Sequence, residues 1–420
     1  MKLNFSQKSW FVLFFTSFLL SPNQANATTE LALQLDVSWL QDSNPLRFAQ
    51  DVNLNRVLPG GKLEDSVLAN DLRFALIHPL DSPETRLVFT GQLGQRRFEQ
   101  MTQLNHTESA YKASFEWRWS DQWKGALSHL KAQQLYAYEN GSLTDREMTH
   151  WVTDKAELAL QITPDIEVPL AISARQLAHD LPVNWVFDRD EKIVDAGVRF
   201  RTTSGSMLGL GVRSTEVTSP KRTAQQVSSL DSGYQDKEVY AESSWQYSAL
   251  TRFDGRIASL HRSYVNLSAM NFSAMTTELK VRYDYSAKTR LTLDLWSRPY
   301  GVTDPAVLYA IGAGARLGAR WQATAKTRLS LQASNEAQRY HSSYMALGPF
   351  NTELNQRRMG GSIDYAATRA IRFYVDGFRE QLRRGALGAD IAQNVFRLGF
   401  EYTYENMPGV AERNLFGGWR

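Results

Sequence analysis

A period-two alternation of apolar and polar residues constrains the fold more than any other feature of this sequence. Residues 31–39, LALQLDVSW, place leucine, valine and tryptophan at odd positions and small or polar residues at even positions. The same pattern recurs in residues 111–119, 279–285 and 291–295. Successive side chains of a strand point to opposite faces, whereas an amphipathic helix requires a period of 3.6. The alternation therefore predicts an all-β protein.

The connections between these segments fall into two classes. Short turns are predicted near HPLDSPETR, WSDQWKG, ITPDIEV and RTTSGSM, and after YDYS, RWQA and IDYA, which form a weak repeat. Short turns at one end and long loops at the other are typical of a transmembrane antiparallel β-barrel of the bacterial outer membrane. About eighteen strands are counted, and an even number places both termini on the periplasmic, short-turn side. The long polar connections are predicted at 40–70, 99–110, 132–154, 176–194, 214–238, 261–275, 299–308, 336–357 and 379–393.

The N-terminus has the three parts of a secretory signal. Lys2 and Lys8 precede and flank an apolar run, and Ala25-Asn26-Ala27 provides small residues for cleavage. We therefore expect a signal peptide over 1–27, a barrel over 28–404 and a periplasmic tail over 405–420. The chain contains no cysteine, which excludes disulfides, a thiolate metal site and a lipid-modified N-terminal cysteine.

The composition agrees with a barrel. The mean hydropathy is −0.40, and after residue 27 no segment is apolar enough to be a transmembrane helix. A barrel gives this average because only alternate residues of each strand face lipid. A soluble β-sandwich or propeller would also alternate. Neither would explain aromatic strand ends beside short turns or the closing strand described next.

Residues 397–404, RLGFEYTY, resemble the C-terminal assembly signal of bacterial outer-membrane barrels, which the barrel assembly machinery recognises. Leu398, Phe400, Tyr402 and Tyr404 are expected to face lipid, and Gly399 lies between them on the other parity. The signal normally ends the chain, but here the segment 405–420 follows it. The last residues of this tail, NLFGGWR, could tuck into the barrel mouth or be disordered, and of these two we expect disorder.

No catalytic, metal-binding or cofactor-binding motif stands out. The seven histidines are scattered, and the sequence contains no HExxH, GxSxG or Walker motif. We therefore predict that the protein is not an enzyme and holds no metal or cofactor. The formal net charge of +3 gives no reason to expect a nucleic-acid partner.

The polar face of the predicted strands carries the candidate functional residues. If the apolar face meets lipid, the polar face lines the lumen, and from residue 280 onward it is richer in arginine than in acid. Arginine-lined pores attract anions, but such residues can also form cross-strand ion pairs that stiffen the wall. Gly314 and Gly318 are expected to leave room beside two of the arginines. The candidate arginines are Arg282, Arg290, Arg316, Arg320, Arg328 and Arg372, with Asp284, Asp294, Asp364 and Asp376 interleaved.

Two stretches resemble the EpsL-type outer-membrane proteins encoded with exopolysaccharide clusters, in the group of putative β-barrel porins. They are LDVSWLQDSNPLRF at 35–48 and YKASFEWRWSDQWKGALSH at 111–129. The resemblance implies export or surface retention of a polysaccharide, which the arginines suggest is anionic. Expected partners are the polysaccharide, outer-membrane lipid and periplasmic polysaccharide-export components. The alternatives are a general or small-molecule porin, or a structural or adhesive barrel whose loops bind surface glycan.

Overall fold

The structure is a computed structural model, and it describes most of the chain that follows the expected signal peptide. The expected peptide, 1–27, lies outside the described residues. None of the helices in the described part of the chain has the length and apolar character needed to cross a membrane. The described residues are 28–49, 52–53, 58, 61–82, 84–136, 144–300, 307–342, 353–384 and 390–415.

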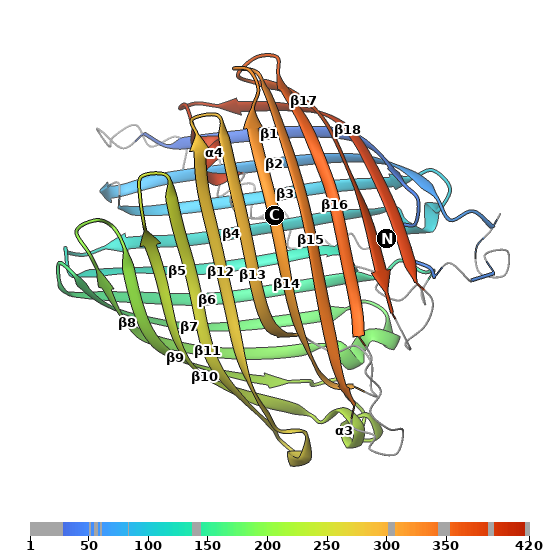
Figure 1. Cartoon of the computed structure of the whole chain (residues 1–420), viewed down its shortest axis with the longest axis horizontal. Helices are drawn as coiled ribbons and strands as arrows, with labels where there is room; N and C mark the ends of the chain where they lie inside the picture. The colour runs from blue at the N-terminus through green and yellow to red at the C-terminus, as the bar shows by residue number, and fades with distance from the viewer. Residues whose placement is uncertain are drawn as a thin grey trace, which may run out of the picture.

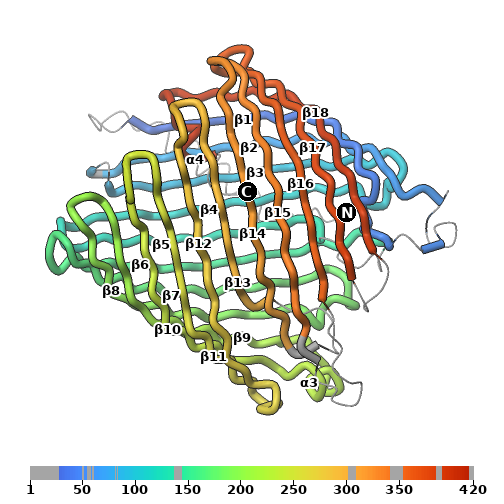
Figure 2. The backbone as a smooth tube through the Cα atoms, viewed as in Figure 1, coloured from blue at the N-terminus to red at the C-terminus, as the bar shows by residue number. Residues whose placement is uncertain are grey.

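Eighteen antiparallel strands form one closed barrel (Figures 1 and 2). Each strand pairs with its neighbours in sequence, and β1 pairs with β18 from Ala32 opposite Glu405 to Asp42 opposite Val395. The predicted all-β barrel and its strand number are confirmed. The strands are β1 Glu30–Asp42, β2 Asp65–Ser82, β3 Thr85–Phe98, β4 His106–Arg118, β5 Trp123–Leu135, β6 Met148–Thr163, β7 Ile166–His179, β8 Arg189–Arg201, β9 Met207–Thr218, β10 Gly233–Gln246, β11 Thr251–Tyr264, β12 Phe272–Ser286, β13 Thr289–Tyr300, β14 Val307–Gln322, β15 Thr327–Ser342, β16 Glu353–Ala366, β17 Ile371–Arg383 and β18 Ile391–Glu405.

The layout of short turns and long loops is as predicted, but the strands reach further toward the long loops than expected. The connection predicted at 132–154 is shorter in the structure because β6 already begins at Met148. Likewise, β2 begins at Asp65, inside the loop predicted to end at residue 70. Backbone pairing continues where the exterior residues become polar. The apolar alternation ends at that point, so the sequence carried no signal for these strand ends.

The barrel has its apolar residues outside and its polar residues inside, the reverse of a soluble protein. In β1, Leu35 is 49% exposed, whereas its neighbours Gln34 and Asp36 are buried. In β18, Leu398, Tyr402 and Tyr404 are exposed and Glu401 is buried. The predicted orientation of the closing strand is therefore correct, with Phe400 on the same outward side of the strand. Such an exterior suits contact with lipid chains rather than water.

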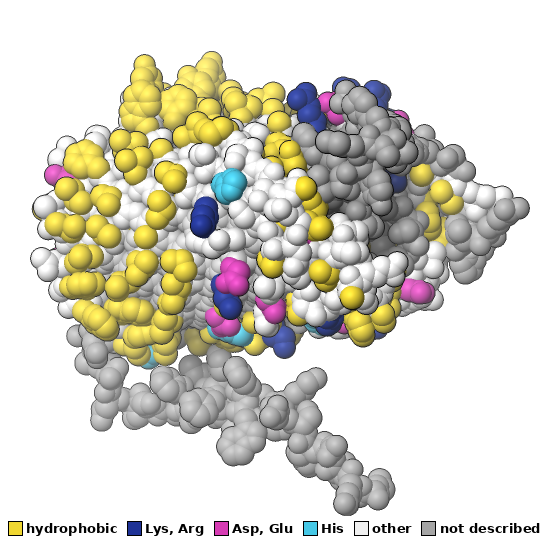
Figure 3. Space-filling model, turned by 90° about the horizontal axis from the view of Figure 1, so that it is seen from below, with side chains coloured by type: hydrophobic (Ala, Val, Ile, Leu, Met, Phe, Trp, Pro, Cys, Tyr) yellow, Lys and Arg dark blue, Asp and Glu magenta, His cyan; other side chains and the backbone are white. Residues whose placement is uncertain are grey.

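The apolar exterior forms a band toward the short-turn end of the barrel. On the outside of β8, Phe200, Val198 and Val194 follow one another from the turn, and then Lys192 and Asp190 continue the same row. On the face shown in Figure 3, hydrophobic side chains likewise gather toward one end and charged ones lie further along. Outer-membrane barrels present an outward-facing apolar band of this kind, roughly 25 Å tall, to the lipid hydrocarbon.

The described part of the C-terminal tail is folded inside the barrel, so the disorder expected for NLFGGWR is wrong for its first two residues, Asn414 and Leu415. The short helix α4, Val410–Asn414, packs with Leu415 against Ala32, Ala75 and Ile77 on the inner face of β1 and β2. The Glu405 carboxylate accepts hydrogen bonds from the Gly409 and Ala411 amides, each at 3.0 Å. Residues 416–420 of NLFGGWR lie outside the described residues. The alternation rule could not detect this tail, because it is not a strand.

Further hydrogen bonds hold the turn that leads into α4. Asn406 accepts a hydrogen bond from the Leu31 amide at 2.7 Å and donates one to the Thr29 carbonyl, also at 2.7 Å. Arg413 forms an ion pair with Glu30 at 3.1 Å. The chain therefore leaves β18, turns inward and is tied to the start of β1.

Three acidic side chains at the long-loop end bind backbone amides of a neighbouring loop. Asp65 accepts hydrogen bonds from the Glu99, Gln100 and Met101 amides. Glu147 accepts one from the Leu181 amide. Asp231 accepts hydrogen bonds from the Asn266 and Leu267 amides, each at 2.7 Å. We call these contacts acid clamps.

The acid clamps recur at every fourth strand, since they lie at the starts of β2, β6 and β10. The loop that each one holds contains a short 3-10 helix: η2 Thr102–Leu104, η3 Pro182–Phe187 and η4 Ser268–Met270. The loop before β10 contains the seven-residue helix α3, Ala224–Leu230, and the third clamp, at Asp231, follows it directly and fixes the return to β10.

Candidate functional site: the charged lumen

All six arginines predicted to line the lumen lie on its inner wall. The register places Arg290 opposite Arg320, Arg316 opposite Asp294 and Arg372 opposite Glu401. These residues share the inward parity of their strands, because Leu291, Leu317 and Phe373 between them are exposed on the outside. Arg282 and Arg328 follow the same rule on β12 and β15. Whether these side chains select anions stays a prediction.

Two aspartates each serve two arginines on this wall. Asp284 lies 2.5 Å from Arg290 and 3.5 Å from Arg282. Asp364 lies 2.7 Å from Arg372 and 3.5 Å from Arg328, and Arg372 also forms a bidentate pair with Glu401. Arg372 is therefore held as part of the wall, whereas Arg282 and Arg290 share one aspartate.

Arg320 and Arg316 are the least compensated of the six. Among the residues that the structure describes, Arg320 has no acidic group within 4 Å, and its direct cross-strand partner is Arg290. Arg316 is exposed and meets Asp294 only at 3.8 Å. Like charges placed directly opposite each other in a sheet are unfavourable. This part of β13–β15 therefore presents unneutralised positive charge to the lumen.

The room expected beside Gly314 and Gly318 is already occupied. A Cβ on Gly314 would lie 2.3 Å from the Trp296 ring, and one on Gly318 would lie 2.5 Å from the Thr292 hydroxyl. Trp296 lies flat over the glycine and donates a hydrogen bond to Glu336 at 3.0 Å. The glycines therefore make space for cross-strand neighbours and not for the arginines, which corrects the prediction.

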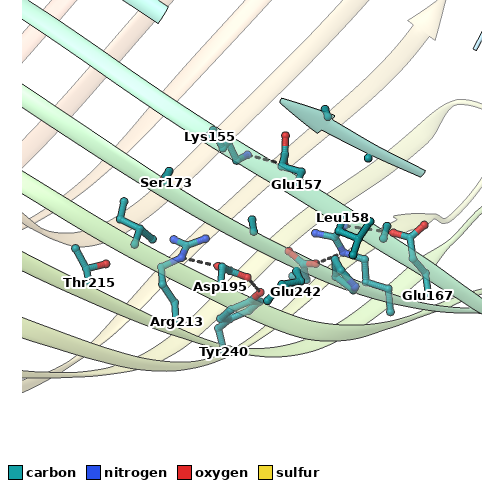
Figure 4. A pocket seen from close by; sticks show the side chains of 18 of the residues that line it. Lys155, Glu157, Leu158, Glu167, Ser173, Asp195, Arg213, Thr215, Tyr240 and Glu242 are labelled. Carbon is teal, nitrogen blue, oxygen red and sulfur yellow. Dashed lines mark hydrogen bonds and ion pairs between the residues drawn. The ribbon is translucent and has the colours of Figure 1, made fainter. Parts of the chain in front are cut away.

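The opposite wall encloses a cavity of about 900 Å³ that the sequence did not single out as a site. Figure 4 labels lining residues from β6, β7, β8, β9 and β10, and charged residues of β3, β4, β5 and β11 also line the cavity. Arg213 pairs with Asp195 at 2.6 Å, and the Tyr240 hydroxyl donates to the same carboxylate at 2.7 Å. Lys155 pairs with Glu157 at 2.5 Å. Basic, acidic and phenolic groups thus share one surface.

Glu167 is the centre of a second group in this cavity. Lys124 approaches it at 2.5 Å, Arg199 at 3.5 Å and Arg201 at 3.6 Å, and its carboxylate is nearly fully buried. Arg199 also pairs with Glu242 at 2.7 Å, so three cations face two acids and one positive charge remains for a ligand. The sequence signal was present, because Arg199 and Arg201 have inward parity, but Lys124 lies in WKGALSHLK, where alternation is weak.

The loop between β1 and β2 reaches the inner wall at the long-loop end. Arg47 forms an ion pair with Glu380, a buried residue on the inner face of β17. Asn44 donates to the Phe48 and Ala392 carbonyls and thereby fixes this part of the loop. Leu46 and Phe48 pack with Met101 and other apolar residues. The loop therefore narrows the mouth of the barrel at the long-loop end.

Among the described residues, no three His, Asp or Glu side chains are arranged to hold a metal ion.

Comparison with solved structures gives the same fold. The OccK2 (OpdF) structure of Pseudomonas aeruginosa has a TM-score of 0.51 with 9% identity, covering 90% of this chain and 98% of that one. The same protein in complex with glucuronate has a TM-score of 0.50, with 10% identity and the same coverage. The fold is that of an outer-membrane barrel. The ferric enterobactin receptor PfeA of the same organism is less similar, with a TM-score of 0.49, 8% identity and coverage of 91% and 81%.

At these identities the likeness concerns the fold alone. No family model matches the sequence, and no curated protein matches it significantly. The expected membership of the EpsL-type group is therefore not confirmed. The solved barrels agree with the porin group as a fold, which is the coarser part of that resemblance.

Proposed function

We propose that the protein is an outer-membrane channel through which small hydrophilic solutes pass, with a preference for anions. The inside-out distribution of apolar residues and the porin-like fold support the location. With short turns toward the periplasm, both termini would be periplasmic. The observation that supports the anion preference is the environment of Arg320. Arg290 lies directly opposite it, and no described acidic group is within 4 Å of the Arg320 side chain.

The solutes that suit this lumen are small carboxylates, such as sugar acids. A guanidinium binds a carboxylate through two parallel hydrogen bonds, whereas a lysine acts as a point charge. The cavity of about 900 Å³ lies within the range of small-ligand sites. OccK2, whose fold is similar, has been solved with glucuronate. An anionic exopolysaccharide would also suit the charge of this lumen, but no feature described above favours a long polymer over a small solute.

Selectivity can be tested directly on the purified barrel in a planar bilayer. We expect a salt gradient to give a reversal potential of the sign for anion preference. The double variant Arg316→Glu with Arg320→Glu should weaken or reverse it, because it places acids where the cationic excess lies. The matched control, Lys192→Glu with Lys237→Glu, makes the same charge change on the exterior of β8 and β10 and should leave the potential unchanged. Cation preference in the unmodified barrel would overturn the proposal.

Substrate class can be tested by the swelling of liposomes that contain the barrel. Glucuronate, glucose and glucosamine are similar in size and differ in charge. We expect glucuronate to enter fastest and glucosamine slowest, and the lumen double variant to remove this order. Equal rates for all three would indicate a pore too wide for the arginines to sense its contents.

A further inference from the structure

Three arginines form an isolated basic cluster on the outside of β16 and β17. Arg357, Arg379 and Arg383 have the outward parity of Met359 and Phe373, and all three are exposed. None has an ion pair or hydrogen bond from its side chain to any described residue. We call this group the exterior arginine cluster.

The register brings the three side chains within reach of one another. Arg357 lies opposite Gln381, and Arg379 and Arg383 are two residues to either side of Gln381. Diagonal neighbours of this kind are roughly 7–8 Å apart at Cα. Arginine side chains can span that distance, so two of them can reach a single small anion.

The cluster begins where the apolar band ends. Arg379 is directly opposite Met359, which is 68% exposed, and Ile363 and Phe373 continue the apolar exterior toward the short turns. Arg357 is one step further from the turns. The charged ends of these side chains would therefore lie at the level of lipid headgroups and not beyond the membrane.

Neutralising acid is scarce around the cluster. The outward neighbours of Arg357 on β15 and β17 are Asn335 and Gln381. The sequences of the adjoining loops, 343–352 and 385–389, contain no Asp or Glu. Of the two acids at its edge, Glu353 pairs with Arg339 at 3.0 Å. The other, Asp390, accepts a hydrogen bond from the Arg384 amide and forms no ion pair with Arg383.

Some exterior charges elsewhere on the barrel face an opposite charge. Lys192 on β8 lies directly opposite Glu216 on β9, and Asp190 is next in the same row. On β5 and β6, His129 contacts Asp154 at 2.7 Å. Basic residues at this level can therefore be matched by an acid, which the three arginines are not. An unopposed cluster of like charge is unfavourable unless an anion binds to it.

We propose that the exterior arginine cluster binds the phosphate groups of a lipid A-type glycolipid in the outer leaflet. This rests on the location proposed above, because the long-loop end then faces the leaflet that such glycolipids occupy. Arginine is suited to phosphate through charge-assisted, bidentate hydrogen bonds. The adjacent Met359 and Ile363 would contact the acyl chains. Basic patches on membrane proteins bind anionic headgroups for the same electrostatic reason.

The test measures lipid binding to the full barrel by native mass spectrometry. The probes are bisphosphorylated lipid A, its dephosphorylated form and phosphatidylglycerol. The unmodified barrel should bind bisphosphorylated lipid A at least about tenfold more tightly than either of the others. The triple variant Arg357→Gln, Arg379→Gln and Arg383→Gln should lose this difference. The control, Lys192→Gln with Lys237→Gln, should keep it.

Equal binding of the dephosphorylated form, or unchanged binding by the triple variant, would overturn the proposal. Equal binding of phosphatidylglycerol would overturn the glycolipid assignment in favour of any anionic headgroup. Heat-modifiability on gels establishes that each variant is folded. If the triple variant does not fold, the single variant Arg379→Gln replaces it, and it should show a partial loss of the preference for bisphosphorylated lipid A. The bilayer reversal potential of the triple variant should be unchanged. Failure of lipid binding and failure of channel selectivity are therefore separate results.

Discussion

At the scale of single residues, Arg372 shows how strongly a lumen arginine can be tied to the wall. It contacts Asp364 at 2.7 Å and pairs in bidentate fashion with Glu401, whose side chain is nearly fully buried. We expect Arg372→Ala to destabilise the barrel by about 3 kcal/mol, because removing one partner leaves a buried charge uncompensated. Urea unfolding in lipid vesicles, followed by tryptophan fluorescence, measures the change.

Arg290→Ala is the matched control for that variant. Arg290 also pairs with an aspartate, but both side chains are substantially exposed. Exposed pairs contribute little, so a loss below about 1 kcal/mol is expected. Similar losses for both variants would show that water reaches Glu401 and that burial does not distinguish the two pairs.

Gly314 and Trp296 form a cross-strand pair in which each residue requires the other. We expect Gly314→Ala to cost roughly 1–3 kcal/mol, because the new Cβ overpacks against the indole ring. The ring would have to move, and its hydrogen bond to Glu336 would be strained. The double variant Gly314→Ala with Trp296→Ala should then lose less free energy of unfolding than the sum of the losses in the two single variants.

Additive losses in that double-variant cycle would contradict the close contact. The sequence could predict that Gly314 faces the lumen, because its parity is fixed by Leu317 and Ala315. It could not predict what fills the space beside it. That depends on the register between β13 and β14, which alternation within one strand does not determine.

At the scale of elements, the acid clamp at Asp231 gives the loop after β11 a defined pH response. Burial by itself raises the pKa of Asp231, but hydrogen bonds from the Leu267, Asn266 and Ser232 amides outweigh it and hold the pKa below its ordinary value near 3.8. A carboxylate with a lowered pKa contributes stability above the ordinary value. That stability is lost as the pH falls through the folded-state pKa.

We therefore expect the loop after β11 to loosen below about pH 3.8, the ordinary value for Asp231. Amide hydrogen exchange at Asn266 and Leu267, corrected for intrinsic rates, measures the protection at each pH. Asp231→Asn should weaken protection by about 1.5 kcal/mol at neutral pH, the contribution of hydrogen bonds to a charged acceptor. It should also remove the acid-dependent step. If the loss of protection at low pH persists in Asp231→Asn, another titrating group causes it.

The elements themselves were predictable to different degrees. The parts of the strands that lie within the apolar band are predicted by the alternation, as in LALQLDVSW, because each outward-facing residue there contacts lipid and is apolar. The strand ends beyond the band could not be predicted, since Lys192 and Asp190 extend β8 with no apolar partner in their row. The clamps have no local signature, because Asp65 and the loop it holds are distant in sequence.

At the scale of the whole molecule, the inward-folded tail should control one mouth of the channel. Deletion of 407–420 removes α4 and Leu415 from the inner face of β1 and β2. We expect an assembled barrel with higher single-channel conductance, because the signal-like strand remains and the mouth is wider. Loss of the buried valine and leucine should lower stability by about 3 kcal/mol.

Arg413→Ala is the control, because it removes only an exposed ion pair with Glu30 and should leave conductance unchanged. Unchanged conductance after the deletion would show that α4 lies beside the opening and does not restrict it. Failure of the deleted barrel to assemble would instead make the tail part of the assembly signal.

The sequence was sufficient to predict an all-β barrel and its closing strand, because lipid requires alternate residues of every strand to be apolar. The arrangement of charged residues in the lumen could be predicted only in part. Arg320 has the parity of a pore residue, but its lack of an acidic neighbour depends on how β13, β14 and β15 are paired. The cavity around Glu167 depends on residues from strands that the sequence separates widely. Such sites emerge only when the wall is closed.

The recurrence of the acid clamps bears on how a barrel of this size can change. They mark the starts of four-strand units at β2, β6 and β10, and the remaining strands β14–β17 form a group of the same size that completes the wall with β1 and β18. Insertion or loss of one complete unit would keep the strand number even and both chain ends on the same side. It would also leave β1 and β18 able to meet. Tandem duplication of a four-strand segment is thus a route by which the gene could yield wider or narrower pores without redesigning the seam.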